Sequence, residues 1–217
     1  MSEVPAKPPL RRSNGLIAGV AVGVIAAAAA IYLISDRGRK EEAPATPTLT
    51  APAGKVTKQL ATGSLTAFIV RPERLPAPDL KFTTASGETK SLNDWRGRVV
   101  LVNLWATWCA PCRKEMPSLS ALERQMGSKD FEVIAISLDR KGAAAAQSYL
   151  KETGATDLAL FLDPSAATLD QLQAIGLPAS VLIDRRGNEI GRMLGPAEWS
   201  SPEAIALVKT ALAEASS

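Results

Sequence analysis

An apolar run from Val99 to Trp105 is the feature that most constrains the fold of this chain of 217 residues. It is apolar except for Asn103, which is typical of a β-strand buried on both faces. The run leads within four residues to Cys109, followed by Cys112, the two cysteines of the sequence. A helical pattern follows at once, and its apolar side consists of Met116, Leu119, Leu122 and Met126. A buried strand that leads directly into an amphipathic helix indicates an α/β domain.

Strands and helices continue to alternate along the chain. A hairpin is expected first, from Lys81–Thr83 and Thr89–Leu92 around Gly87. The later expected strands are Phe131–Leu138, Leu158–Leu162, Ser180–Asp184 and Glu189–Met193, the last two joined as a hairpin about Arg186-Gly187. The expected helices are Ala143–Glu152, Ala166–Gln173 and a last one that is capped by Ser201 and begins with Pro202 and Glu203. This order predicts an α/β sandwich around a mixed sheet.

The N-terminal part differs from the rest of the chain. Gly15 to Ile34 is a stretch of twenty residues without a charge, long enough to span a bilayer as a helix. The alternative is a cleaved signal peptide, whose apolar stretch is usually about 7–15 residues; the continuation through Ile31–Ile34 favours an uncleaved anchor. We therefore expect a cytoplasmic N-terminus (1–14), a transmembrane anchor (15–35), a Pro/Ala/Thr-rich linker (36–55) and a globular domain (56–217).

Charge and composition exclude several classes of function. Residues 1–60 carry 8 Lys and Arg against 4 Asp and Glu, whereas residues 61–217 carry 17 against 18. The nearly neutral domain argues against nucleic-acid binding. The chain has no histidine, which excludes Ser-His or Cys-His catalytic pairs and histidine-bound zinc. We expect no resident metal and no cofactor, so the chemistry depends on carboxylates, lysines, hydroxyls or the pair of thiols.

The two cysteines have the spacing of a redox-active pair at the start of a helix. Cys109 is expected at the helix N-terminus, where free N–H groups and the helix dipole stabilise a thiolate. Cys112 is expected one turn inside, shielded from solvent, so the outer sulfur attacks a substrate and the inner one resolves the mixed disulfide. A structural disulfide gains little stability from a two-residue loop, and a metal site would lack two ligands. The pair therefore predicts thiol-disulfide exchange.

The sequence around this pair, Trp105-Ala-Thr-Trp108-Cys109-Ala110-Pro111-Cys112, resembles the thioredoxin superfamily. Within it the chain resembles the TlpA-like membrane-anchored thiol:disulfide oxidoreductases, over roughly residues 56–217. The resemblance implies a thioredoxin-like three-layer sandwich with a central mixed sheet, preceded by one N-terminal transmembrane helix. It also implies that Pro178 is a cis-proline opposite the CxxC. The residues expected to contact substrate are Trp108, Ala110, Pro111 and Leu177, the last through its backbone.

Glu115 matches an acid that periplasmic members of this family keep near the active site. It lies one turn along the helix from Cys112 and is expected to accept or return the proton of the buried thiol. The alternative is a solvated helix glutamate. Asn103 departs from thioredoxin, which has a buried aspartate at this strand position. Because an amide cannot relay a proton, Glu115 or water must take that role. The alternative for Asn103 is that it simply satisfies a buried backbone group.

The resemblance implies a reductase that acts on substrate proteins with oxidised cysteine pairs. Members of the family are re-reduced by a membrane electron donor of the DsbD/CcdA kind. The substrates are proteins of copper-site and cytochrome oxidase assembly, or apocytochrome c. Members devoted to apocytochrome c carry Gly-Tyr-Gly-x-Pro at the cis-proline, whereas this chain has Gly176-Leu177-Pro178, which favours the copper-site substrates.

Two rival functions use the same cysteines. A Cu(I)-binding chaperone is possible with two thiolates, although Sco-like proteins of this fold add a histidine. A peroxidase needs Thr-x-x-Cys, and Thr107 stands two residues before Cys109 instead of three.

The topology follows from the expected reaction. The anchor is flanked by three basic residues on each side, so the charges do not set its orientation. A reductant is needed where proteins are oxidised. We therefore expect a single-pass protein of the bacterial inner membrane with its catalytic domain in the periplasm.

Overall fold

The computed structural model describes residues 55–214. The expected cytoplasmic segment and membrane anchor, and the linker up to residue 54, lie outside these residues. Within residues 55–214 no helix is both long and apolar enough to cross a membrane.

The described chain forms one mixed sheet of eight strands in the order β1-β8-β7-β4-β5-β6-β2-β3. Their bounds are β1 (Ile69–Val70), β2 (Lys81–Thr84), β3 (Thr89–Ser91), β4 (Val99–Trp105), β5 (Phe131–Ser137), β6 (Leu160–Leu162), β7 (Ala179–Ile183) and β8 (Glu189–Leu194). Strands β4, β5 and β6 are parallel, and the other pairs are antiparallel. The mixed sheet predicted from the sequence is therefore confirmed.

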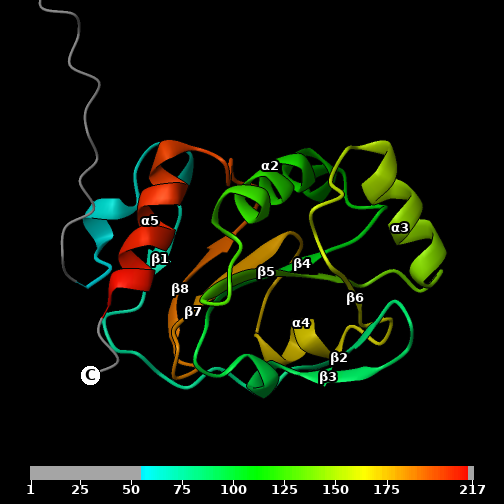
Figure 1. Cartoon of the computed structure of the whole chain (residues 1–217), viewed down its shortest axis with the longest axis horizontal. Helices are drawn as coiled ribbons and strands as arrows, with labels where there is room; N and C mark the ends of the chain where they lie inside the picture. Colours follow the sequence, from blue (N-terminus) through cyan, green and yellow to red (C-terminus); the bar gives the residue numbers. More distant parts are fainter. Residues whose placement is uncertain (1–54, 215–217) are drawn as a thin grey trace, which may run out of the picture. The chain divides into compact units, whose positions relative to one another are not determined.

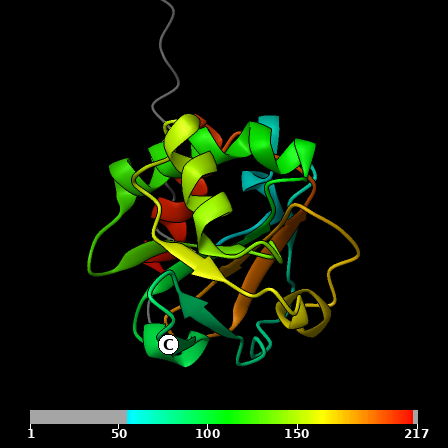
Figure 2. The same ribbon diagram turned by 90° about the vertical axis from the view of Figure 1, so that its right-hand side faces the viewer.

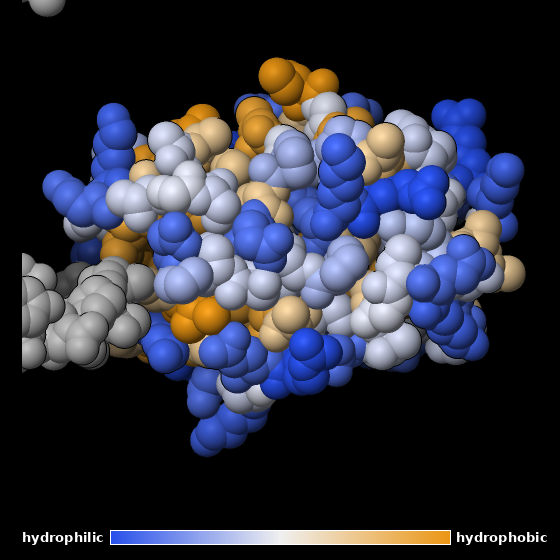
Figure 3. All heavy atoms as spheres, turned by 90° about the horizontal axis from the view of Figure 1, so that it is seen from above, coloured by the Kyte–Doolittle hydropathy of each residue, from blue (hydrophilic) through white to orange (hydrophobic). Residues whose placement is uncertain are grey.

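Helices cover both faces of this sheet (Figures 1 and 2). Helices α2 (Ala110–Met126), α3 (Ala143–Glu152) and α5 (Pro202–Ala213) pack on one face. The short helix α4 (Ala167–Gln171) and the 3-10 turn η3 (Leu92–Trp95) lie on the other. Two further 3-10 turns, η1 (Lys58–Leu60) and η2 (Gly63–Leu65), precede β1. Seen from the side of α2, α3 and α5, the surface is mainly hydrophilic (Figure 3), because the apolar sides of these helices are turned to the sheet.

Strand β4 lies at the centre of both hydrophobic clusters. Its side chains alternate between the two faces: Leu101 and Trp105 join the cluster under α2, whereas Val102 and Leu104 join the opposite cluster. Every residue of β4 is buried, as the continuous apolar run predicts. Asn103 shares the face of Leu101 and Trp105, which turns its amide toward α2.

Most elements lie within one residue of the bounds that the sequence predicts, and two are shorter by more than one residue. The helix expected at Ala166–Gln173 is limited to Ala167–Gln171, because Ala166 and Gln173 adopt positive φ angles of 59° and 52°, which a right-handed helix does not allow. The strand expected at Leu158–Leu162 is limited to Leu160–Leu162, the three residues that pair with β5.

The segment before the first long strands is bound to the edge of the sheet. Strand β1 pairs with β8, with Ile69 opposite Arg192 and Val70 opposite Gly191. The Arg74 guanidinium donates to the carbonyl of Ile190 and to the carboxylate of Glu214 at 2.8 Å. The apolar stretch from Leu65 to Val70 therefore packs on the domain, and its last two residues extend the sheet.

At Gly191 of β8 the backbone of β1 and the ring of Phe68 leave no room for a side chain. A Cβ at this position would lie 2.5 Å from the carbonyl oxygen of Ile69 and 2.6 Å from the ring of Phe68. We expect Gly191→Ala to lower the free energy of unfolding by about 1–3 kcal/mol, because a backbone atom cannot yield to the added methyl group. Urea unfolding measures this change. The matched control is Gly176→Ala, since a Cβ there meets nothing within 4 Å; an equal loss in both variants would contradict the prediction.

Candidate active site

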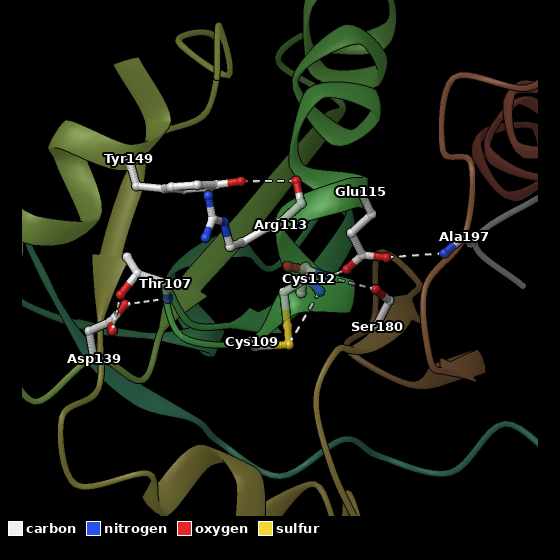
Figure 4. The surroundings of a disulfide bond; sticks show 10 residues. Thr107, Cys109, Cys112, Arg113, Glu115, Asp139, Tyr149, Ser180 and Ala197 are labelled. Atoms are coloured by element: carbon white, nitrogen blue, oxygen red, sulfur yellow. Dashed lines mark hydrogen bonds between the residues drawn. A yellow bond between two sulfur atoms is a disulfide. The ribbon is translucent and has the colours of Figure 1, made fainter. Parts of the chain in front are cut away.

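The loop between β4 and α2 brings the two cysteines to the helix N-terminus. Cys109 is the N-cap of α2, and its sulfur accepts a hydrogen bond from the backbone N–H of Cys112 at 3.2 Å. The two sulfurs are joined in a disulfide, with the Cα atoms 5.3 Å apart (Figure 4). Pro111 lies in the first turn of the helix, where its missing N–H removes no helical hydrogen bond. After reduction, the same N–H and the helix dipole stabilise a Cys109 thiolate.

The two cysteines differ in their access to solvent. Cys109 is 5% exposed and Cys112 is fully buried. The neighbours on the outer side, Ala110 and Pro111, are exposed, and the Trp108 side chain is 70% exposed. The outer and inner positions predicted from the helix spacing are thus found, and a partner can reach the disulfide only from the side of Cys109.

Asp139 holds the active-site loop, a role that is not predicted from the sequence. Its carboxylate accepts from the Thr107 N–H at 2.9 Å, from the Thr107 hydroxyl at 2.6 Å and from the Ser137 hydroxyl at 2.8 Å. Asp139 is 2% exposed. The loop that carries Cys109 is therefore tied to the end of β5. The sequence feature that indicates this role is an acidic residue directly after the buried run Phe131–Leu138.

A proline inside α2 adds a second support for the start of the helix. Pro117 has no N–H, so the carbonyl of Arg113, four residues earlier, has no helical donor. This carbonyl accepts instead from the Tyr149 hydroxyl of α3 at 3.0 Å. The Arg113 guanidinium also lies over the Tyr149 ring, 5.0 Å from its centre. Helix α3 thereby fixes the first turns of α2, next to the cysteines (Figure 4).

Glu115 is a buried carboxylate beneath α2, and the solvated alternative considered for it is wrong. Only 2% of the residue is exposed. Its Oε1 accepts from the Asn103 side-chain amide at 2.8 Å, and its Oε2 accepts from the backbone N–H of Ala197 at 3.1 Å. Residues three apart on a helix lie side by side, with about 5–6 Å between their Cβ atoms, so Glu115 is a neighbour of the buried Cys112.

The environment of Glu115 changes its acidity. Burial raises its pKa from the ordinary value of 4.5 to about 7, although the hydrogen bonds from Asn103 and Ala197 partly oppose the rise. A carboxyl group with this pKa is close to half protonated at neutral pH, which suits both accepting and returning a proton.

The hypothesis that Asn103 satisfies a buried backbone group is wrong. Its amide nitrogen donates to two side chains, Glu115 at 2.8 Å and the Ser180 hydroxyl at 2.9 Å. These bonds connect β4 with α2 and with β7. Asn103 therefore positions the acid and takes no proton itself.

The predicted cis-proline is present beside the CxxC. The peptide bond between Leu177 and Pro178 is cis. Leu177 and Gly176 line a groove that Cys109, Ala110, Pro111 and Trp108 line from the other side. The groove has a volume of about 870 Å³. All four residues expected to contact substrate thus lie around one groove, together with the reactive sulfur.

Comparison with known proteins shows the family to which the chain belongs. The model of the Redoxin family matches residues 73–208, more than half of the chain. The chain therefore belongs to the Redoxin family, as a TlpA-like member of the thioredoxin superfamily.

The curated relatives carry related names. The thiol-disulfide oxidoreductase ResA of Bacillus thuringiensis is 32% identical over 119 residues, which cover 55% of this chain and 68% of ResA. The thioredoxin-like protein YneN of Bacillus subtilis is 32% identical over 112 residues, 51% of this chain and 65% of YneN. The matches thus span about two thirds of the length of these relatives.

A solved structure shares the arrangement as well. The thiol:disulfide interchange protein of Chlorobium tepidum, a thioredoxin family protein, superposes with a TM-score of 0.54 at 26% identity, covering 65% of this chain and 99% of that one. The folded domain is that of a thiol:disulfide oxidoreductase.

The raised pKa of Glu115 predicts a pH-dependent stability. Between pH 4.5 and 7 the folded protein holds a proton on Glu115 that the unfolded chain has lost. The free energy of unfolding of the oxidised protein should therefore fall as pH rises through this window, by about 3 kcal/mol in total. We expect Glu115→Gln to remove this fall in urea unfolding measured at pH 5 and pH 8. The exposed Glu73→Gln is the control and should keep it. An unchanged pH dependence in the Glu115 variant would refute the assignment.

Proposed function

We propose that the protein reduces disulfides in partner proteins by exchange with the Cys109–Cys112 dithiol. The observation that carries this proposal is the asymmetry of the pair: one sulfur opens onto a groove, and the other is buried beside a carboxyl group of raised pKa. A structural disulfide needs neither a groove nor a proton acceptor.

The reaction has two exchange steps. The Cys109 thiolate attacks one sulfur of the substrate disulfide, forms a mixed disulfide and releases the other substrate sulfur as a thiolate, which takes a proton from solvent. The Cys112 thiol then loses its proton and attacks the Cys109 sulfur, and the second substrate thiolate leaves. Two electrons pass from the protein to the substrate, and the protein ends with the disulfide seen in the structure.

Glu115 takes the proton in the second step. The carboxylate is the neighbour of Cys112 on α2, and burial keeps solvent from the inner thiol. When the disulfide is reduced again, the same carboxyl group returns the proton. Its pKa of about 7 makes both transfers possible near neutral pH.

We assign the protein to the periplasmic face of the bacterial inner membrane, anchored through residues 15–35. The substrates we propose are cysteine pairs in copper-site and cytochrome oxidase assembly, which must be reduced before they bind metal. A membrane donor of the DsbD/CcdA kind supplies the two electrons for each cycle. Gly176-Leu177-Pro178 in place of Gly-Tyr-Gly-x-Pro supports these substrates over apocytochrome c.

A Cys112→Ser variant should trap the substrate. Without the resolving thiol, Cys109 stays in a mixed disulfide with its partner, which nonreducing electrophoresis and mass spectrometry identify. The Cys109→Ser variant is the matched control and should trap nothing, because Cys112 is fully buried. Trapped copper-site assembly proteins or an oxidase subunit support the proposal. Trapped apocytochrome c would instead indicate a function in cytochrome c maturation. The absence of any cysteine-linked partner would refute the oxidoreductase function.

The topology has its own test. Alkaline phosphatase folds to an active form only outside the cytoplasm, where its disulfides can form. A fusion of the enzyme after Ser217 should therefore be active in intact cells. An inactive fusion that is present in normal amounts would contradict the periplasmic placement, whatever the redox activity of the domain.

A further inference from the structure

The groove beside Cys109 combines an apolar floor with a basic rim. Besides Ala110 and Pro111 next to the disulfide, its apolar lining includes Trp108, Leu138, Ala166, Leu169 and Leu177. Arg140 and Lys141 also line it, from the loop between β5 and α3. A substrate segment that reaches Cys109 therefore meets these two cations.

The two cations are held near the reactive sulfur. They follow Asp139 directly, and the Asp139 carboxylate is bonded to Thr107, two residues before Cys109. The contact that fixes the active-site loop thus also fixes the start of the loop that carries Arg140 and Lys141.

The positive charge of the rim is only partly offset within the groove, where Arg140 and Lys141 stand against one carboxylate. Asp139 is the one acidic residue among the described residues that line it. It is 2% exposed, and its oxygens already accept from Thr107 and Ser137. Arg140 and Lys141 are exposed, and neither forms an ion pair with another residue in the range 55–214.

We infer that this groove selects substrate segments in which acidic residues flank the oxidised cysteine, with Arg140 and Lys141 as the specificity-determining residues. The inference rests on the proposed function and narrows its substrate class. Since residues 61–217 carry 17 basic and 18 acidic residues, the whole domain provides no strong attraction for an acidic partner. The selectivity therefore comes from the local pair of cations.

Single-turnover kinetics with short peptides test the inference. The full chain is purified in detergent, reduced with dithiothreitol and freed of the reductant. It is then mixed with peptides that each contain one internal disulfide. The peptides differ only in the residues beside the cysteines: these residues are Glu in one peptide, Gln in the second and Lys in the third. The protein's own dithiol supplies the two electrons, and the loss of its thiols gives the rate constant. We expect the Glu peptide to react about three- to tenfold faster than the Gln peptide, and the Lys peptide more slowly than both.

Salt and charge reversal show whether the preference is electrostatic and local. At about 1 M salt, where charges are screened beyond about 3 Å, the three rates should converge. The double variant Arg140→Glu and Lys141→Glu should reverse the order of the Glu and Lys peptides. The control is Lys129→Glu and Lys209→Glu, which changes the net charge equally at exposed residues outside the groove. It should keep the original order.

The outcomes separate the inference from the proposed function. Equal rates for the three peptides, or an unchanged order in the Arg140 and Lys141 variant, would overturn the inference and leave the oxidoreductase intact. Failure to reduce any peptide would count against the proposed function as well. If charge reversal abolished self-association in sedimentation and left the peptide rates unchanged, the groove would be assigned to a second copy of the chain and the inference would also be overturned.

Discussion

The buried contact between Asn103 and Glu115 is the interaction on which the active-site geometry depends. A carboxyl group in an apolar core is costly unless hydrogen bonds satisfy it. Here the donors come from β4 and from the backbone of Ala197, and Asn103 also reaches Ser180 of β7. Close packing of apolar side chains already holds a helix on a sheet, and these directional bonds further fix α2, and with it the cysteines, against the central strands.

The rest of the site is built on this fixed helix. Asp139 holds the loop before Cys109, and Tyr149 holds the first turns of α2 through the carbonyl that Pro117 leaves free. The rigid parts are buried, while Trp108 and the outer side of the pair remain open to a partner. This division is what thiol exchange requires, because the inner thiol must be protected while the outer one is reached.

The elements predicted correctly from the sequence are those whose signal lies in neighbouring residues. The buried strand Val99–Trp105, the capped helix after Ser201 and the CxxC at a helix N-terminus are predicted by patterns of neighbouring residues, and the structure confirms them. The ends of α4 were missed because they depend on the positive φ angles of Ala166 and Gln173. The function of Asp139 was missed because its partner, Thr107, lies 32 residues away.

The sequence by itself determined the chemistry, because the two thiols, their spacing and the absence of histidine are properties of the chain. It also determined the order of strands and helices, because the spacing of apolar residues along the chain distinguishes a strand from a helix. Only the tertiary structure decided the acidity of Glu115, the role of Asn103 and the basic rim of the groove. Each of these depends on burial or on contacts between residues that are distant in the chain. Burial sets the free-energy cost of a charge, and contacts between distant residues decide which charges remain unpaired.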